Sequence, residues 1–140
     1  MLKAIVVDDT SMVRKTLKYF LEKELGHMVV AEASNGVEGV NIFKAHSPDL
    51  VTMDITMPDM DGIEAVKKII EINPEAKIIM VTSYGQEDMV LKAVRSGASS
   101  YLVKPITGDK LQDAIAKVFS EYPASNNNNQ DALDEYDIEI

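Results

Sequence analysis

The stretch "VTMDITMP", residues 51–58, places Asp54 directly after a run of β-forming residues and shortly before a methionine–proline pair. Asp54 in this position is either a residue that caps a turn or a residue placed at a strand end to do chemistry. A second apolar run, "KAIVVDD" at residues 3–9, also ends in acids, Asp8 and Asp9. Continuous apolar runs of this kind are typical of strands buried on both faces, as in parallel sheets covered by helices.

On both sides of residues 51–58, strand-like and helix-like segments alternate along the chain. The segments at 3–9, 28–33, 48–54, 76–82 and 100–104 are predicted strands. The segments between and after them show helical spacing of apolar residues, such as Leu111, Ala114, Ile115 and Val118 in the last one. Each crossover is long enough for a right-handed βαβ unit. The pattern therefore predicts an α/β fold, a parallel sheet with helices on both faces.

Local signals mark where these helices begin and end. Asn35 with Glu38, and Asp61 with Glu64, have the spacing of capping boxes at helix N-termini. Gly26 is placed to end the first helix. In a sheet of this kind, ligands bind outside the carboxyl ends of the strands, where the strand order reverses. These ends read Asp8-Asp9, Asp54, Thr82-Ser83 and Lys104.

Composition limits the class of protein. The 140 residues suit one domain, and the net charge of -9 argues against non-specific nucleic-acid binding, which needs a basic footprint. The chain has no cysteine, no apolar run long enough to span a membrane and no signal-peptide pattern. We therefore expect a cytoplasmic protein that binds neither membrane nor nucleic acid.

The end of the chain differs in composition. Residues 123–140 begin with an asparagine run and then carry five acids and no base. We interpret residues 1–122 as the folded domain and residues 123–140 as an Asn-rich linker with an acidic C-terminal tail. The tail is either solvated or a segment that docks onto a partner or onto its own domain.

The acidic residues at the predicted edge of the sheet would repel one another. A hard cation relieves the repulsion, and Mg²⁺ accepts carboxylate, carbonyl and phosphate oxygens. The sequence has no P-loop, so a phosphate would be held by the metal and by Lys104. Asp54 could then act as a nucleophile that forms an aspartyl phosphate, and Thr82 could hydrogen-bond the phosphate. Taken singly, each residue also has a structural explanation, such as a helix cap for Asp8 or Asp9.

The motifs together resemble the receiver domains of two-component response regulators, in particular stand-alone chemotaxis regulators of the CheY type. The resemblance covers residues 1–120. It rests on "VDD" at 7–9, "MDITMPDMDG" at 53–62, "VTS" at 81–83, "GAS" at 97–99 and "YLVKP" at 101–105. It implies a flavodoxin-like (βα)5 doubly wound fold, with a five-stranded parallel sheet in the order 2-1-3-4-5.

The resemblance also implies a role for each matched position. Asp54 would be the phospho-acceptor, and Asp8, Asp9, Asp54 and the backbone carbonyl of Thr56 would hold Mg²⁺. Thr82 and Tyr101 would form the switch pair, Lys104 would bind the phosphate, and the bond to Pro105 would be cis. Thr56 and Tyr84 would tune dephosphorylation. Because neither is an acid or an amide that positions an attacking water, we predict a long-lived phosphoryl group.

The implied function is a phosphorylation-activated signalling switch rather than an enzyme with an external substrate. A CheA-like histidine kinase would phosphorylate Asp54, and a monomeric chain would then change its binding to a partner protein through the face of the fourth helix, fifth strand and fifth helix. In chemotaxis the partner would be a flagellar motor switch protein, and a phosphatase is a further expected partner. A single-domain phosphorelay receiver with another target is the alternative.

Three other classes fit the sequence less well. A haloacid-dehalogenase type enzyme would need an acid at position 56, where "DIT" has Thr56. A flavodoxin-type cofactor binder would need a glycine- or hydroxyl-rich phosphate loop after the first strand, and the acids of "DDTSMVRK" would repel a phosphate. A receiver-like module that has lost phosphorylation would not be expected to keep the full set of acids, threonine and lysine.

Overall fold

The computed structural model describes residues 1–120, and within them strands and helices alternate as predicted. The predicted boundary at residue 122 and the linker and tail at 123–140 lie outside the described residues. The strands are β1 (Lys3–Val7), β2 (Met28–Ala33), β3 (Leu50–Asp54), β4 (Ile78–Thr82) and β5 (Ser100–Val103). The helices are α1 (Ser11–Tyr19), the π-helical turn η1 (Phe20–Glu24), α2 (Gly36–His46), α3 (Gly62–Ile72), α4 (Glu87–Arg95) and α5 (Gly108–Phe119).

The five strands form one parallel sheet in the order β2-β1-β3-β4-β5, which confirms the predicted topology. β3 and β4 are buried at every residue. After β1 the chain first adds β2 on one side of β1 and then returns to add β3 on the other side. The strand order therefore reverses between β1 and β3. The acids that follow β1 and end β3 therefore lie at the position where ligands bind in open α/β sheets.

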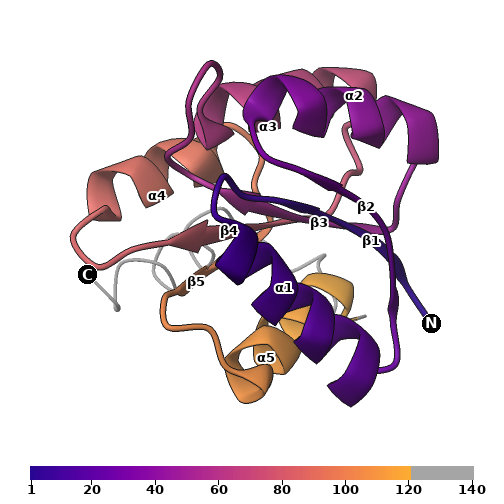
Figure 1. The fold of residues 1–140 in the computed structure, drawn as a ribbon. Coiled ribbons are helices and arrows are strands. Elements are labelled where there is room, and N and C mark those ends of the chain that lie inside the picture. The colour runs from indigo at the N-terminus through magenta and orange to yellow at the C-terminus, as the bar shows by residue number, and fades with distance from the viewer. Residues whose placement is uncertain (121–140) are drawn as a thin grey trace.

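The helices cover both faces of the sheet (Figure 1), with α2, α3 and α4 on one face and α1, η1 and α5 on the other. Alternate residues of each strand supply the two cores, because successive side chains of a strand point to opposite faces. In β1, Ile5 and Val7 belong to the α2–α3–α4 core, and Ala4 and Val6 belong to the α1–α5 core. The sheet thus separates two hydrophobic cores.

The helix ends follow the local signals in the sequence. Asn35 accepts a hydrogen bond from the backbone N–H of Glu38 at 2.9 Å, and Asp61 accepts one from Glu64 at 2.9 Å. These contacts satisfy N–H groups that have no partner inside the helix. Gly26 has a φ of +75°, a left-handed conformation that favours glycine, and it follows the predicted first helix.

One helix differs from the prediction. The first helix does not run as a uniform α-helix to Gly26, because its last turn, Phe20–Glu24, is π-helical. Leu17 and Leu21 are nevertheless both buried in the α1–α5 core, as their spacing predicts. Within this turn, Glu22 accepts a hydrogen bond from the backbone N–H of Val29 at 3.0 Å, which ties the helix end to β2.

Candidate functional site

The predicted site residues come from four neighbouring strands and meet at one edge of the sheet. Asp8 and Asp9 follow β1, Asp54 is the last residue of β3, Thr82 is the last residue of β4, and Lys104 follows β5. The register pairs Val7 with Met53, Asp54 with Val81 and Thr82 with Val103, so the strands end at similar heights. Parallel pairing in this register is what brings distant parts of the sequence together.

Three carboxylates form the centre of the site. Oxygen atoms of Asp8, Asp9 and Asp54 all lie within 4.8 Å of one another. Asp8 and Asp54 are buried, with exposed fractions of 0% and 6%, whereas Asp9 is exposed. Acids at this separation in a partly desolvated site destabilise one another's charged forms.

Burial and mutual repulsion change the acidity of the two buried carboxyls. Desolvation, followed by the charge of Asp8, raises the pKa of Asp54 from 3.8 to about 7, against the opposing effect of Lys104. Desolvation also raises the pKa of Asp8, although the backbone N–H of Thr10 donates a hydrogen bond to its carboxylate at 2.8 Å. In the absence of a metal ion, Asp54 therefore keeps its proton to a higher pH than an exposed aspartate does.

Lys104 supplies a positive charge beside this cluster. Its Nζ lies 3.6 Å from Oδ2 of Asp8 and 3.8 Å from Oδ1 of Asp54, so one ammonium group contacts both buried acids. The Lys104–Pro105 peptide bond is cis. Lys110 donates from Nζ to the carbonyl oxygens of Val103 and Pro105, at 3.2 and 3.1 Å, and so holds the loop that carries Lys104.

The donor set fits a divalent cation. Among the described residues, Oδ2 of Asp8 is buried and accepts no hydrogen bond, and its ion pair with Nζ of Lys104 is long, at 3.6 Å. A buried carboxylate oxygen of this kind costs free energy unless a cation or a donor satisfies it. Oxygen ligands from two or three carboxylates suit Mg²⁺, which keeps part of its water shell. An ion at this point would be held by Asp8, Asp9 and Asp54, and it would neutralise charge on an oxygen ligand that binds beside Asp54.

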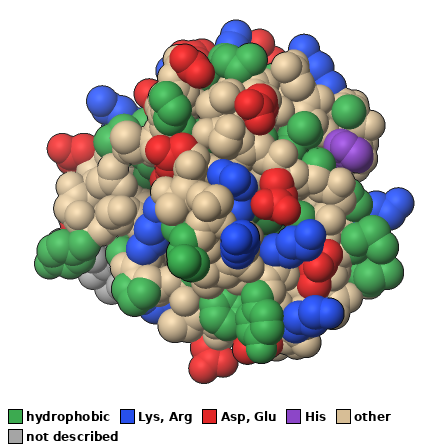
Figure 2. All heavy atoms as spheres, viewed as in Figure 1, with side chains coloured by type: hydrophobic (Ala, Val, Ile, Leu, Met, Phe, Trp, Pro, Cys, Tyr) green, Lys and Arg blue, Asp and Glu red, His purple; other side chains and the backbone are tan. Residues whose placement is uncertain are grey.

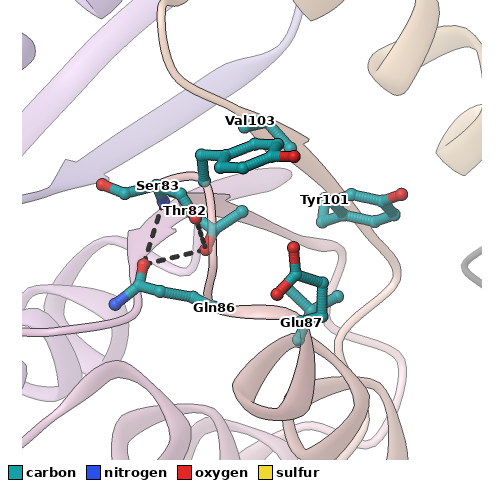
Figure 3. A pocket seen from close by; sticks show the side chains of 8 residues that line it. Thr82, Ser83, Gln86, Glu87, Tyr101 and Val103 are labelled. Carbon is teal, nitrogen blue, oxygen red and sulfur yellow. Dashed lines mark hydrogen bonds between the residues drawn. The ribbon is translucent and has the colours of Figure 1, made fainter. Parts of the chain in front are cut away.

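Thr82 is present at the site, but its hydroxyl is engaged by a residue that the sequence analysis did not identify. Oγ1 of Thr82 donates to Oε1 of Gln86 at 2.9 Å, with the carbonyl oxygen of Ser83 at 3.2 Å as a second acceptor (Figure 3). The backbone N–H of Ser83 also donates to Oε1 of Gln86 at 2.9 Å. Nε2 of Gln86 donates to Oγ1 of Thr56 at 2.8 Å. Gln86 thus connects the loop after β3 with the end of β4.

Tyr101 and Tyr84 lie at a small pocket beside Thr82. Tyr101 is half-buried on β5, and Figure 3 shows its ring directed away from Thr82. Tyr84 is 92% exposed, so its ring has almost no packing contact. The lining of the pocket comes from the β4–α4 loop, α4 and β5: Thr82, Ser83, Tyr84, Gln86, Glu87, Val90, Tyr101 and Val103.

The loop that follows Asp54 is shaped by Gly62. A Cβ atom at position 62 would overlap with the carbonyl oxygen of Asp54 and would lie 2.9 Å from the Cα atom of Ile55. The backbone N–H of Gly62 donates to the carbonyl oxygen of Ile55 at 2.7 Å. The start of α3 therefore packs directly against the backbone of Asp54, and only glycine leaves room for that approach.

One further residue near the site, Arg14, comes from the helix after β1. Nη1 of Arg14 donates to the carbonyl oxygen of Asp8 at 2.7 Å, while its Nε lies 3.4 Å from Glu32 on β2. Arg14 thus fixes the backbone at Asp8 and ties α1 to the sheet.

On the face of the molecule in Figure 2, Lys and Arg side chains lie among acidic ones rather than in a separate basic region.

Comparison with known proteins assigns this arrangement to a family. The model of the response regulator receiver domain matches residues 4–116, and the chain belongs to this family. It is similar to chemotaxis protein CheY of Bacillus subtilis, with 48% identity over 118 residues, which cover 84% of this chain and 98% of that protein. It is also similar to chemotaxis protein CheY of Thermotoga maritima, with 44% identity over 83% of this chain and 96% of that protein.

Solved structures agree with this assignment. The CheX–CheY complex of Borrelia burgdorferi, which contains BeF3 and Mg²⁺, includes a chain that matches with a TM-score of 0.79 and 34% identity, over 84% of this chain and 88% of that chain. The predicted family and fold are therefore confirmed. The family defines a response-regulator switch of two-component signalling that is activated by phosphorylation, rather than an enzyme that turns over an external substrate. None of the helices within residues 1–120 combines the length and apolar character needed to cross a membrane.

Proposed function

We propose that Asp54 is the phospho-acceptor of this switch. One observation carries the proposal: Asp54 is a buried carboxylate whose Oδ1 lies 3.8 Å from Nζ of Lys104 and whose neighbours are two more acids. An oxygen of Asp54 would attack the phosphorus of a phosphohistidine in a histidine kinase. The new O–P bond forms as the N–P bond to the kinase histidine breaks.

The other site residues have supporting roles in this proposal. Asp8, Asp9 and the backbone carbonyl of Thr56, together with Asp54, are the proposed ligands of Mg²⁺. Lys104 is placed to pair with a phosphoryl oxygen, since its Nζ already contacts Asp54. Thr82 would donate its hydroxyl hydrogen to the phosphoryl group, and Tyr101 would follow by turning inward.

A labelling experiment tests the acceptor. The full chain is incubated with radiolabelled acetyl phosphate and Mg²⁺, and incorporation is compared between wild type, Asp54→Asn and the control Asp113→Asn, which removes an exposed acid of α5. We expect Mg²⁺-dependent labelling of wild type and of the control, and none of Asp54→Asn. Equal labelling of all three would show that another residue is modified.

The proposed output is a change in binding to a partner protein through the face of α4, β5 and α5. A flagellar motor switch protein is the proposed partner, because both CheY relatives named above are chemotaxis proteins. The Borrelia relative, a CheY crystallised with CheX, shows that a protein of this kind associates with another protein. The kinase would be CheA-like and the location cytoplasmic, and a single-domain phosphorelay receiver with another target remains the second candidate.

A binding assay separates these candidates. Immobilised full-length chain is exposed to a purified motor switch protein and to a purified phosphotransfer protein, with and without beryllofluoride and Mg²⁺. Retention of the motor protein only with beryllofluoride supports the chemotaxis function, and retention of the phosphotransfer protein alone supports the phosphorelay. The same assay with a chain ending at residue 122 tests the proposed division into a receiver domain and a C-terminal tail.

A further inference from the structure

Gln86 makes three hydrogen bonds with one side-chain amide. Its Oε1 accepts from the hydroxyl of Thr82 and from the backbone N–H of Ser83, each at 2.9 Å. Its Nε2 donates to Oγ1 of Thr56 at 2.8 Å, across a sequence separation of 30 residues. Figure 3 shows the amide oxygen directed at Thr82 and Ser83, with both contacts drawn. The amide therefore joins the loop that follows Asp54 to the end of β4.

The hydroxyl of Thr82 cannot serve two acceptors fully at once. A threonine hydroxyl has a single hydrogen to donate, and in this structure Oε1 of Gln86 at 2.9 Å is its nearer acceptor, with the carbonyl oxygen of Ser83 at 3.2 Å as the other. To donate to a phosphoryl oxygen on Asp54, Thr82 has to release Oε1 of Gln86. The hydrogen bond to Gln86 therefore exists only in the arrangement without phosphate, and its free energy favours that arrangement.

Gln86 is also attached to the first turn of α4. Its carbonyl oxygen accepts from the backbone N–H groups of Met89 at 3.1 Å and Val90 at 3.0 Å. It occupies the N-cap position of α4, yet its side chain makes no capping hydrogen bond to that helix. The side chain reaches back to Thr82 and Thr56 instead. Release of the Gln86 amide from Thr82 therefore changes the hydrogen bonds that hold the residue at the start of α4.

We propose that Gln86 is a positioning residue that holds Thr82, Thr56 and the start of α4 in the unphosphorylated arrangement. The inference rests on the proposed function, because it requires Thr82 to move toward a phosphoryl group on Asp54. Phosphorylation then has to break the Thr82–Gln86 contact, which removes one of the three hydrogen bonds that hold Gln86 at the start of α4. Removal of the amide should shift the equilibrium toward the active arrangement without phosphate.

The test measures the affinity of the full chain for beryllofluoride in the presence of Mg²⁺, by isothermal titration. In Gln86→Met the side chain keeps its length and loses all three hydrogen bonds, and we expect binding about fivefold tighter than in wild type. Gln86→Ala, which adds no apolar chain to a half-exposed position, should change in the same direction. Asn73→Ala is the matched control, because it removes a side-chain amide that accepts from Glu75 at 2.9 Å in the turn after α3, and it should bind as wild type does.

A double-mutant cycle then shows whether Gln86 acts through Thr82. In a Thr82→Val background, most of the gain from Gln86→Met should disappear. Affinity that is unchanged or weakened in both Gln86 variants overturns the proposal, since a merely structural residue would only weaken binding when removed. An equal gain with and without the Thr82 hydroxyl also overturns it. If wild type fails to bind beryllofluoride and acetyl phosphate fails to label Asp54, the proposed function itself falls, and the inference falls with it.

Discussion

Asp54 is buried beside two other acids, and this placement costs the metal-free protein stability. Its carboxyl holds a proton more tightly in the folded chain, where its pKa is about 7, than in the unfolded chain, where the ordinary value is 3.8. Between these values the folded state binds more protons than the unfolded state, so stability falls as the pH rises. The pKa of Asp8 is also raised in the folded chain, chiefly by burial. The site therefore favours the binding of protons or of a metal ion, because either neutralises these carboxylates.

The substitution Asp54→Asn tests this electrostatic cost. Without Mg²⁺, the free energy of unfolding of wild type should decrease as the pH rises from about 4 to about 7, and the substitution should remove most of that decrease. At pH 7.5 the variant should be more stable than wild type by about 2 kcal/mol. Urea unfolding in a chelating buffer across this pH range measures the effect. Asp113→Asn, which removes the same charge from an exposed site, should change the stability little, and a similar gain there would contradict the explanation.

Tyr84 offers a test of the predicted long-lived phosphoryl group. Its ring is 92% exposed, so replacing it disturbs no packing. Tyr84→Gln introduces an amide that can position an attacking water, and the lifetime of the phosphoryl group should shorten by about fivefold. Loss of label after removal of the phosphodonor measures it. Tyr84→Phe should keep the wild-type lifetime, and loss of the wild-type label within seconds would contradict the prediction.

Among individual residues, the sequence indicated the three acids of the site as well as Thr82 and Lys104, because each has a distinctive chemistry at a strand end. It did not indicate Gln86. Glutamine is common and is not a preferred N-cap residue, and its role depends on two loops that meet only in the folded chain. Its position four residues after Thr82, directly before the acids that open α4, was the available signal.

Among the elements, the junction of β3 and α3 leaves no room for a side chain at Gly62. Gly62→Ala would force a methyl group against the backbone of Asp54, since a Cβ atom there lies 2.9 Å from the Cα atom of Ile55. We expect a loss of about 1–3 kcal/mol in the free energy of unfolding and a slower rate of labelling by acetyl phosphate, because Asp54 shifts. Lys68→Ala, on the exposed face of the same helix, should stay within about 0.5 kcal/mol of wild type and label normally. Normal labelling of Gly62→Ala would show that this contact does not position Asp54.

The strands and most helix ends were predictable because their signals are local. Apolar runs specified β3 and β4, and the capping residues Asn35 and Asp61 specified the starts of α2 and α3. The π-helical turn at Phe20–Glu24 was not predictable in this way. Its apolar residues keep a spacing that an α-helix also satisfies, so the pattern does not distinguish the two kinds of helix.

For the molecule as a whole, binding at the acidic site should raise stability through linkage. Beryllofluoride with Mg²⁺, at 100 times its dissociation constant, should add about 2.7 kcal/mol to the free energy of unfolding of wild type. This should appear as a rise of several degrees in the melting temperature. A chelator should abolish the gain, and Asp54→Asn should not show it. Equal stabilisation of that variant would place the binding elsewhere.

The sheet between the two cores has a consequence for how sequences of this kind can change. α4, which adjoins the site through Gln86, packs in the core with α2 and α3, whereas α1 and α5 pack in the other. A substitution at Leu17 should therefore alter the stability of the domain more than its signalling balance, whereas Leu111 belongs to α5 and thus to the proposed output face. Substitutions at Val90 or Ala93 would alter both the stability and the signalling balance. The proposed output face takes α4 from one core and α5 from the other, so a partner that binds there meets elements that depend on the packing on both sides of the sheet.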